Sequence, residues 1–142
     1  MKRAYFIVLA LLFISCTANP NDKPMKVKDN AIKALNLLAG QDNFAREKGG
    51  IYTGVHDPVL KAMLNAKFNS AINTFIKAIN DGATKKQYIA LLNTSISGFN
   101  RSLLDTEDAE HLATNFEKIM DCIGLESSDG ALNNWMYGFE PK

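Results

Sequence analysis

Cysteine and histidine are scarce in this chain of 142 residues, which has two of each. The cysteines, Cys16 and Cys122, are too few for a disulfide-rich scaffold, and no Cys or His pair has the spacing of a zinc motif. A metal site normally needs three or four ligands. The sequence therefore predicts no metal and no other cofactor.

Net charge is also low, at +1, and no dense basic patch occurs. Because nucleic-acid-binding domains usually carry such a patch, we expect no nucleic-acid partner. The charges are nonetheless unevenly divided. Residues 23–101 carry 12 Lys or Arg against 5 Asp or Glu, whereas residues 103–142 carry 2 against 9. This division either steers a charged partner or is cancelled when the two parts pack together.

No apolar run is long enough to cross a membrane as a helix. Residues 4–14 form the longest run, which follows Lys2-Arg3 and has the length of the apolar part of a signal peptide. It ends at Phe13-Ile-Ser-Cys16, which resembles the bacterial lipobox except that Phe13 replaces the usual Leu. We expect a signal peptide at residues 1–15 and an acyl chain such as palmitate on Cys16. The alternative is an ordinary secretory signal with an incidental cysteine.

The residues after Cys16 have the composition of a tether. Residues 17–28 include two Pro, two Asn and four Lys or Asp before any apolar periodicity begins. We therefore expect residues 16–28 to hold a domain at residues 29–142 off a lipid membrane, to which acylated Cys16 anchors it. The predicted location is the bacterial cell envelope, facing the periplasm, on either the inner or the outer membrane.

Apolar residues recur every three or four positions through the rest of the chain, and strand-like alternation is absent. This pattern predicts an all-α fold, a single compact domain of about five helices. The expected helices cover about residues 27–39, 58–82, 85–103, 106–123 and 129–137.

Several helix ends are marked by capping residues. Asp57 precedes Pro58 at the start of the second helix, and Thr84 has the spacing of a capping box at the start of the third. Gly124 is the expected C-cap of the fourth helix. Gly98 falls inside the third predicted helix, where close contact between helices would explain a residue that weakens a helix.

The C-terminus is rich in aromatic residues, with Trp135, Tyr137 and Phe139 in five positions. Each large aromatic side chain buries about 150–250 Å² when it is packed. We therefore expect the short aromatic C-terminal helix to fold back and close the core.

A polar turn, Glu126-Ser-Ser-Asp-Gly130, precedes this last helix. Ser127 or Ser128 is predicted to cap the helix, with Glu126 and Asp129 accepting backbone N–H bonds. A serine nucleophile would need an oriented base, which no feature of the sequence specifies. We assign these residues a structural role and assign no catalytic residue.

The connection at residues 41–56 is longer than most, and long connections are often functional. It contains Tyr52 and His56. In the fourth predicted helix, His111 lies four residues after Glu107 and one after Glu110. We take Tyr52, His56, Glu107 and His111 as the candidate surface for a ligand or partner, with both histidines exposed to solvent.

The tail also carries a family resemblance. Asp105-Thr-Glu-Asp108, Phe116-Glu-x-Ile-Met-Asp121 and Gly124-Leu-Glu-Ser-Ser-Asp-Gly-x-Leu-Asn-x-Trp-x-Tyr-Gly-Phe139 together resemble the bacterial family catalogued as domain of unknown function 4844. The resemblance covers mainly residues 105–139 and extends to residues 30–104 by helix pattern. It implies a helical domain and no established activity.

Two functions remain open. The first is a membrane-anchored envelope lipoprotein that binds an envelope protein without catalysis, of which an inhibitor or immunity protein is one form. The second is a small periplasmic hydrolase that uses His111 with Glu107 or Glu110.

Overall fold

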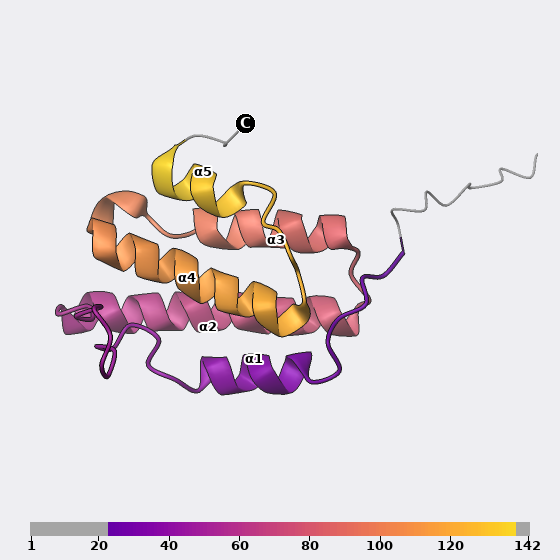
Figure 1. Cartoon of the computed structure of the whole chain (residues 1–142), viewed down its shortest axis with the longest axis horizontal. Helices are drawn as coiled ribbons and strands as arrows, with labels where there is room; N and C mark the ends of the chain where they lie inside the picture. The colour runs from indigo at the N-terminus through magenta and orange to yellow at the C-terminus, as the bar shows by residue number, and fades with distance from the viewer. Residues whose placement is uncertain (1–22, 139–142) are drawn as a thin grey trace, which may run out of the picture.

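The computed structural model describes residues 23–138, and this part of the chain is helical (Figure 1). Within it the only β-type pairing is a single bridge between Pro24 and Thr84. The all-α prediction is confirmed. Cys16, the predicted signal peptide and Phe139 lie outside the described residues. The elements are α1 (Ala31–Ala39), α2 (Pro58–Asn80), α3 (Lys85–Ser97), the 3-10 turn η2 (Arg101–Leu103), α4 (Thr106–Ile123) and α5 (Ala131–Tyr137).

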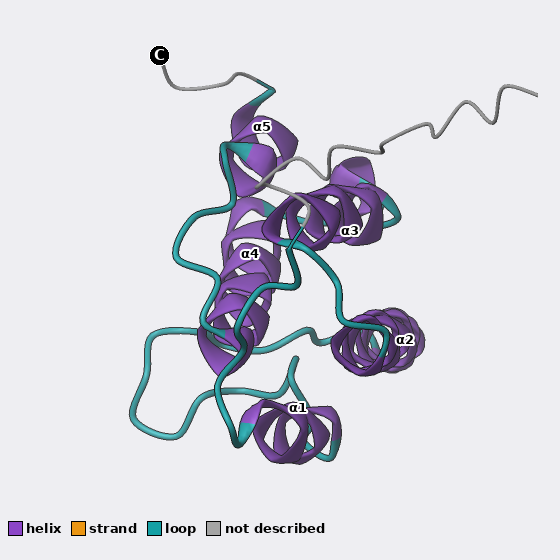
Figure 2. Cartoon of the chain, turned by 90° about the vertical axis from the view of Figure 1, so that its right-hand side faces the viewer, coloured by secondary structure: helices purple, strands orange, loops and turns teal. Residues whose placement is uncertain are grey.

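The first four α-helices form an antiparallel bundle, each running opposite to the one before it (Figure 1). Viewed along their axes, α1, α2, α3 and α4 follow one another around a ring, and α5 covers the side made by α3 and α4 (Figure 2). The loop at residues 41–56 lies at one end of the long axis. The described chain enters at the other end (Figure 1).

Helix α2 forms because a strong start signal precedes a broad apolar stripe. The Asp57 carboxylate accepts hydrogen bonds from the backbone N–H groups of Val59 and Leu60, and Pro58 opens the helix. The buried stripe consists of Leu64, Phe68, Ala71, Ile72 and Phe75. Burial of a large apolar side chain stabilises the fold by roughly 1.5–3 kcal/mol.

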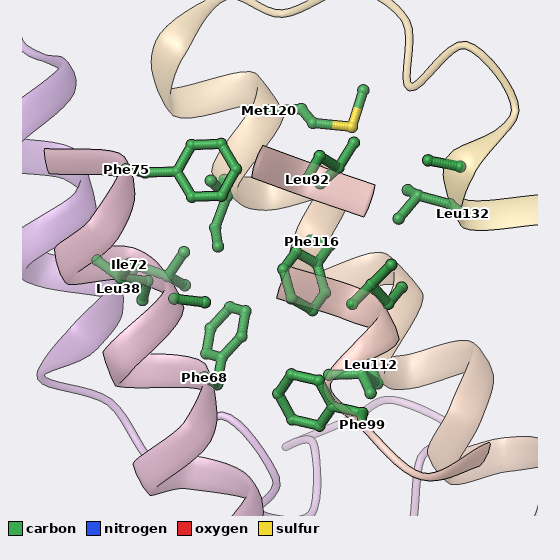
Figure 3. Packing of buried hydrophobic residues seen from close by; sticks show 14 of the residues in the cluster. Leu38, Phe68, Ile72, Phe75, Leu92, Phe99, Leu112, Phe116, Met120 and Leu132 are labelled. Carbon is green, nitrogen blue, oxygen red and sulfur yellow. The ribbon is translucent and has the colours of Figure 1, made fainter. Parts of the chain in front are cut away.

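A chain of edge-to-face aromatic contacts occupies the centre of the bundle. The ring centroids of Phe68 and Phe116 lie 5.6 Å apart at 85°, and those of Phe99 and Phe116 lie 5.8 Å apart at 87° (Figure 3). Phe44, from the long loop, contacts Phe68 in the same manner at 6.3 Å. The loop is therefore joined directly to the core.

Helix α3 is shorter than predicted. Its capping box of Thr84 and Gln87 is present, but Gly98 is the C-cap and does not lie inside the helix. The Gly98 carbonyl accepts a hydrogen bond from Lys67 Nζ at 2.9 Å, and Asn100 then caps the separate turn η2. Phe99 precedes that turn and Leu103 ends it, so their spacing suggested a longer helix than the chain forms.

Residues 24–27, which the sequence assigned to a tether, lie against the helical domain. The Met25 N–H donates to the Ala83 carbonyl at 2.9 Å, next to the bridge between Pro24 and Thr84. Met25 and Val27 are half-buried against the core. Residues 24–27 therefore pack with the domain, because Pro24 and Met25 contact the turn between α2 and α3 and Val27 is half-buried against the core.

Helix α5 begins at Ala131 and has no side-chain cap, so the predicted serine caps are wrong. Ser127 instead donates its hydroxyl proton to the Asp129 carboxylate and accepts the Asp129 N–H. Asp129 and Gly130 both have positive φ angles, 48° and 85°, and thus turn the chain before the helix. Gly124 is the left-handed C-cap of α4, as predicted.

The C-terminal helix closes the core mainly with aliphatic side chains. Leu132 and Met136 are buried, whereas Trp135 is half-buried and Tyr137 is 57% exposed. Trp135 Nε1 donates to the Phe99 carbonyl at 3.2 Å. The prediction of a closing helix is confirmed, but the two described aromatics lie at the edge of the contact.

Candidate functional site

The loop at residues 41–56 folds back on itself against the start of α4. Phe44 is fully buried, and the Val55 N–H donates to its carbonyl at 3.0 Å. Farther out, the Glu47 N–H donates to the Tyr52 carbonyl at 3.2 Å. The two arms of the loop therefore contact each other, with the tip at residues 48–51.

Two glycines permit this close approach. Gly54 has a φ of +82°, and a Cβ there would lie 2.6 Å from the backbone nitrogen of Arg46. A Cβ on Gly50 would lie 2.7 Å from the Cβ of Glu47. Side chains at these positions would push the arms apart, because contacts below 3.0 Å do not occur in folded proteins.

Asn43 fastens the base of the loop to three helices. Its side-chain amide donates to the Leu38 carbonyl, and its backbone N–H donates to Asn65 on α2. Its own carbonyl accepts from both His111 Nε2, at 2.8 Å, and Asn115 Nδ2, at 2.9 Å. Each of these polar groups on buried Asn43 has a partner, which removes the cost of burying them.

Tyr52 attaches the second arm of the loop to α4. Its ring stacks on His111 with centroids 3.7 Å apart and planes at 9°, and its hydroxyl donates to the Asp108 carboxylate at 2.7 Å. Burial and the Asp108 hydrogen bond raise the pKa of Tyr52 far above its usual value. The phenol therefore stays protonated and keeps donating to Asp108.

His111 is buried, with 9% of its surface exposed, so the prediction of a solvated histidine is wrong. The fold covers it because the loop lies over the first turns of α4. Burial lowers the pKa of His111, although the Asn43 carbonyl and the Glu47 and Asp108 carboxylates oppose that shift. Because Nε2 faces a carbonyl, it carries the proton in the neutral ring. Nδ1 then presents a lone pair and lies 3.8 Å from Glu47 Oε1.

An open hollow of about 410 Å³ lies between the loop and α4 beside this histidine. Three carboxylates line it, on Glu47, Glu107 and Glu110. The remaining lining residues are Ile51, Tyr52, His111 and Thr114. We call this feature the acidic hollow.

The acidic hollow brings together three of the four residues that the sequence suggested. Tyr52, Glu107 and His111 line it, whereas His56 is exposed and does not. Among the described residues, no hydrogen bond or ion pair joins His111 to Glu107 or Glu110. The carboxylate that faces its ring is on Glu47.

Sequence reasoning missed Glu47, Ile51 and Thr114. Thr114 could have been found, because positions 107, 110, 111 and 114 lie on one face of a helix. Asn43 and Asn115 gave no signal, since single asparagines are common on surfaces. Their pairing depends on tertiary structure.

The surroundings of Cys122 indicate a structural role. Cys122 is half-buried against the core, and burial, with the Asp121 carboxylate, raises the pKa of its thiol. In residues 23–138, no three His, Cys, Asp or Glu side chains are grouped so that they could hold a metal ion. None of the helices in this range has the length and apolar character required to cross a membrane.

Comparison with known proteins gives a family and a solved relative. The family described as a domain of unknown function, DUF4844, matches residues 26–140. The chain resembles a DUF3571 family protein from Acinetobacter baumannii whose crystal structure is known. The two sequences are 40% identical, and the two structures superpose with a TM-score of 0.72. That match covers 76% of this chain and 89% of the other. None of the curated proteins matches the chain.

Proposed function

The chain belongs to the DUF4844 family, and we propose that it is a lipid-anchored protein of the bacterial envelope that binds another protein without catalysis. The proposed binding surface is the acidic hollow with the exposed tip of the loop. Cys16 is the proposed site of acylation.

This proposal rests on the hydrogen bonds that His111 and Tyr52 make. His111 Nε2 donates to the Asn43 carbonyl, and the Tyr52 hydroxyl donates to Asp108. A hydrolytic base would also need a nucleophile at its free nitrogen, and among the described residues no hydroxyl or thiol hydrogen-bonds to His111 Nδ1. Both rings instead fasten the loop to α4. The loop is thereby held in one shape, which favours binding because less conformational entropy is lost.

The distribution of lysines supports the anchor. Lys23 and Lys26 are exposed beside the bridge between Pro24 and Thr84, and Lys85 and Lys86 follow Thr84 directly. Lysines close to an anionic lipid surface each contribute about 1 kcal/mol to membrane binding. Cys16 precedes this basic end by a stretch of chain that can reach at most roughly 25 Å.

This arrangement would point the acidic hollow away from the membrane. The loop and the first turn of α4 lie at the opposite end of the bundle from the start of the described chain (Figure 1). The carboxylates of the acidic hollow would therefore be separated from anionic lipid headgroups by the length of the bundle. That separation exceeds the Debye length of about 8 Å at physiological salt, so the lipid would not repel the hollow.

Photo-crosslinking in the native envelope tests the binding function. A photoreactive amino acid replaces Ile51, which is 94% exposed on the loop, in the full-length protein. The matched control carries it at Leu37, which is 62% exposed on α1. We expect one reproducible protein adduct from position 51 and none from position 37. Equal adducts from both positions, or none from position 51, would refute the proposal.

Metabolic labelling with palmitate tests the anchor. Cys16→Ser should abolish incorporation of the label and release the protein from membranes, while Cys122→Ser should leave both unchanged. Labelling that survives Cys16→Ser would disprove the anchor. It would leave the binding function to be judged by the crosslinking result.

A further inference from the structure

Three of the seven residues that line the acidic hollow carry carboxylates, which accept hydrogen bonds and cannot donate them. Glu47, Glu107 and Glu110 contribute carboxylates, and no Lys or Arg is among the lining residues. Arg46 and Lys48 flank Glu47 on the loop but do not line the hollow. Within this space the carboxylates are therefore left without a cation from the chain itself.

His111 adds an independent acceptor. It is more than nine-tenths buried and lines the hollow, and its Nε2 proton is committed to the Asn43 carbonyl. Nδ1 therefore offers a lone pair, and no described residue donates a hydrogen bond to it. A ligand N–H group in the hollow would donate to this lone pair.

We propose that the acidic hollow binds a lysine or arginine side chain of a partner protein, with Glu47, Glu107, Glu110 and His111 Nδ1 as its acceptors. This inference rests on the proposed binding function and names the chemistry of the partner. A cationic head with several N–H groups supplies the donors that the hollow lacks. The volume of about 410 Å³ lies within the usual range for ligand sites.

Ile51 indicates that the cation belongs to a protein segment rather than to a free polyamine. It is 94% exposed at the edge of the hollow. A partner chain would cover this side chain with an apolar residue next to its basic one, whereas a polyamine has no such group. Burying an exposed isoleucine is favourable at about 25 cal/mol per Å².

Titration of the folded protein with short peptides, followed by backbone amide NMR shifts, tests the inference. The probes are the amidated peptides acetyl-Lys-Leu-Lys, acetyl-Arg-Leu-Arg and acetyl-Ser-Leu-Ser, with spermidine as the polyamine. We expect a basic peptide to shift amides at residues 47–52 and 107–114 at low salt, and the serine peptide to shift none of them. Ile51→Ser should weaken the basic peptide and leave spermidine unchanged.

Charge-matched variants separate a site from general attraction. Glu107→Gln with Glu110→Gln should weaken peptide binding on the order of fivefold, the size expected for two partly exposed ion pairs. Asp121→Asn with Glu126→Gln removes the same charge outside the hollow and should have no effect. His111→Gln keeps a donor for the Asn43 carbonyl but removes Nδ1, and should weaken binding about threefold. Equal weakening by both double variants would overturn the inference, as would shifts spread over the whole acidic surface.

The outcomes also separate this inference from the proposed function. A partner crosslinked at position 51 that presents no Lys or Arg to the hollow would sink the inference and leave the binding function standing. Peptide shifts confined to the hollow without any crosslinked protein would uphold the cation site and count against the protein-binding function. Binding of spermidine as strong as that of the peptides would also overturn the inference, since it assigns the cation to a protein.

Discussion

The ring of Tyr52 lies flat on the ring of His111, with centroids 3.7 Å apart and planes at 9°. These residues are 59 positions apart, one in the loop at residues 41–56 and the other on α4. The stack buries the histidine, and Phe44 contacts the same ring from within the core at 6.2 Å. The His111 ring therefore lines the acidic hollow and at the same time contacts the aromatic core.

The Tyr52 hydroxyl can be tested alone. Tyr52→Phe keeps the stack on His111 but removes the hydrogen bond to Asp108, and we expect a loss of about 1–1.5 kcal/mol in the free energy of unfolding. Urea denaturation measures it. Tyr88→Phe is the control, because Tyr88 is buried and its hydroxyl has no hydrogen-bond partner among the described residues. Its change should stay within about 0.5 kcal/mol. Equal changes in the free energy of unfolding for the two variants would mean that the hydrogen bond from Tyr52 to Asp108 adds no stability.

Stability should depend on pH through His111. Its pKa is lowered in the fold, so the unfolded chain binds the proton more tightly. The stabilisation is complete above the unfolded pKa of about 6.5 and is lost as pH falls through the folded value, at up to about 1.4 kcal/mol per pH unit. Urea unfolding at pH 7.5 and at pH 5.5 measures this loss. His111→Gln should flatten the dependence, while His56→Gln should retain it. A flat wild-type profile would contradict the assignment.

Two loop glycines make a matched pair. Gly49 and Gly54 both have positive φ angles, 80° and 82°, but a Cβ on Gly49 would meet nothing within 4 Å. Gly49→Ala should cost about 1 kcal/mol of unfolding free energy from backbone strain alone. Gly54→Ala adds the contact with the Arg46 backbone and should cost about 2–3 kcal/mol. Thermal or urea unfolding compares them, and equal losses would show that the arms are not in contact.

The closing role of α5 is open to the same kind of test. Leu132→Ala should destabilise the protein by about 2–5 kcal/mol, because Leu132 is 6% exposed and packs in the core. Trp135→Phe removes the bond to the Phe99 carbonyl and should cost about 1 kcal/mol. Should the tryptophan variant prove the more damaging, the aromatic face and not the aliphatic one would close the core.

Local features of the fold were predictable from the sequence. The caps at Asp57, Thr84 and Gly124 lie where the sequence placed them, because each acts on backbone groups within a few residues. The all-α class followed from apolar spacing for the same reason. The failures also have a local cause. Phe99 and Leu103 continued the helical spacing beyond Gly98, and Ser127 and Ser128 are of a residue type that often caps helices.

The candidate site depended on contacts between distant residues. The sequence by itself determined that residues 41–56 form a long loop and that Glu107, Glu110 and His111 share a helix. Only the tertiary structure decided that Phe44 enters the core and that the Asn43 carbonyl accepts a hydrogen bond from His111. A histidine among acidic residues at a helix start has the pattern of a solvated surface. It is buried here because a loop from far along the chain lies over it, and no local spacing encodes that contact.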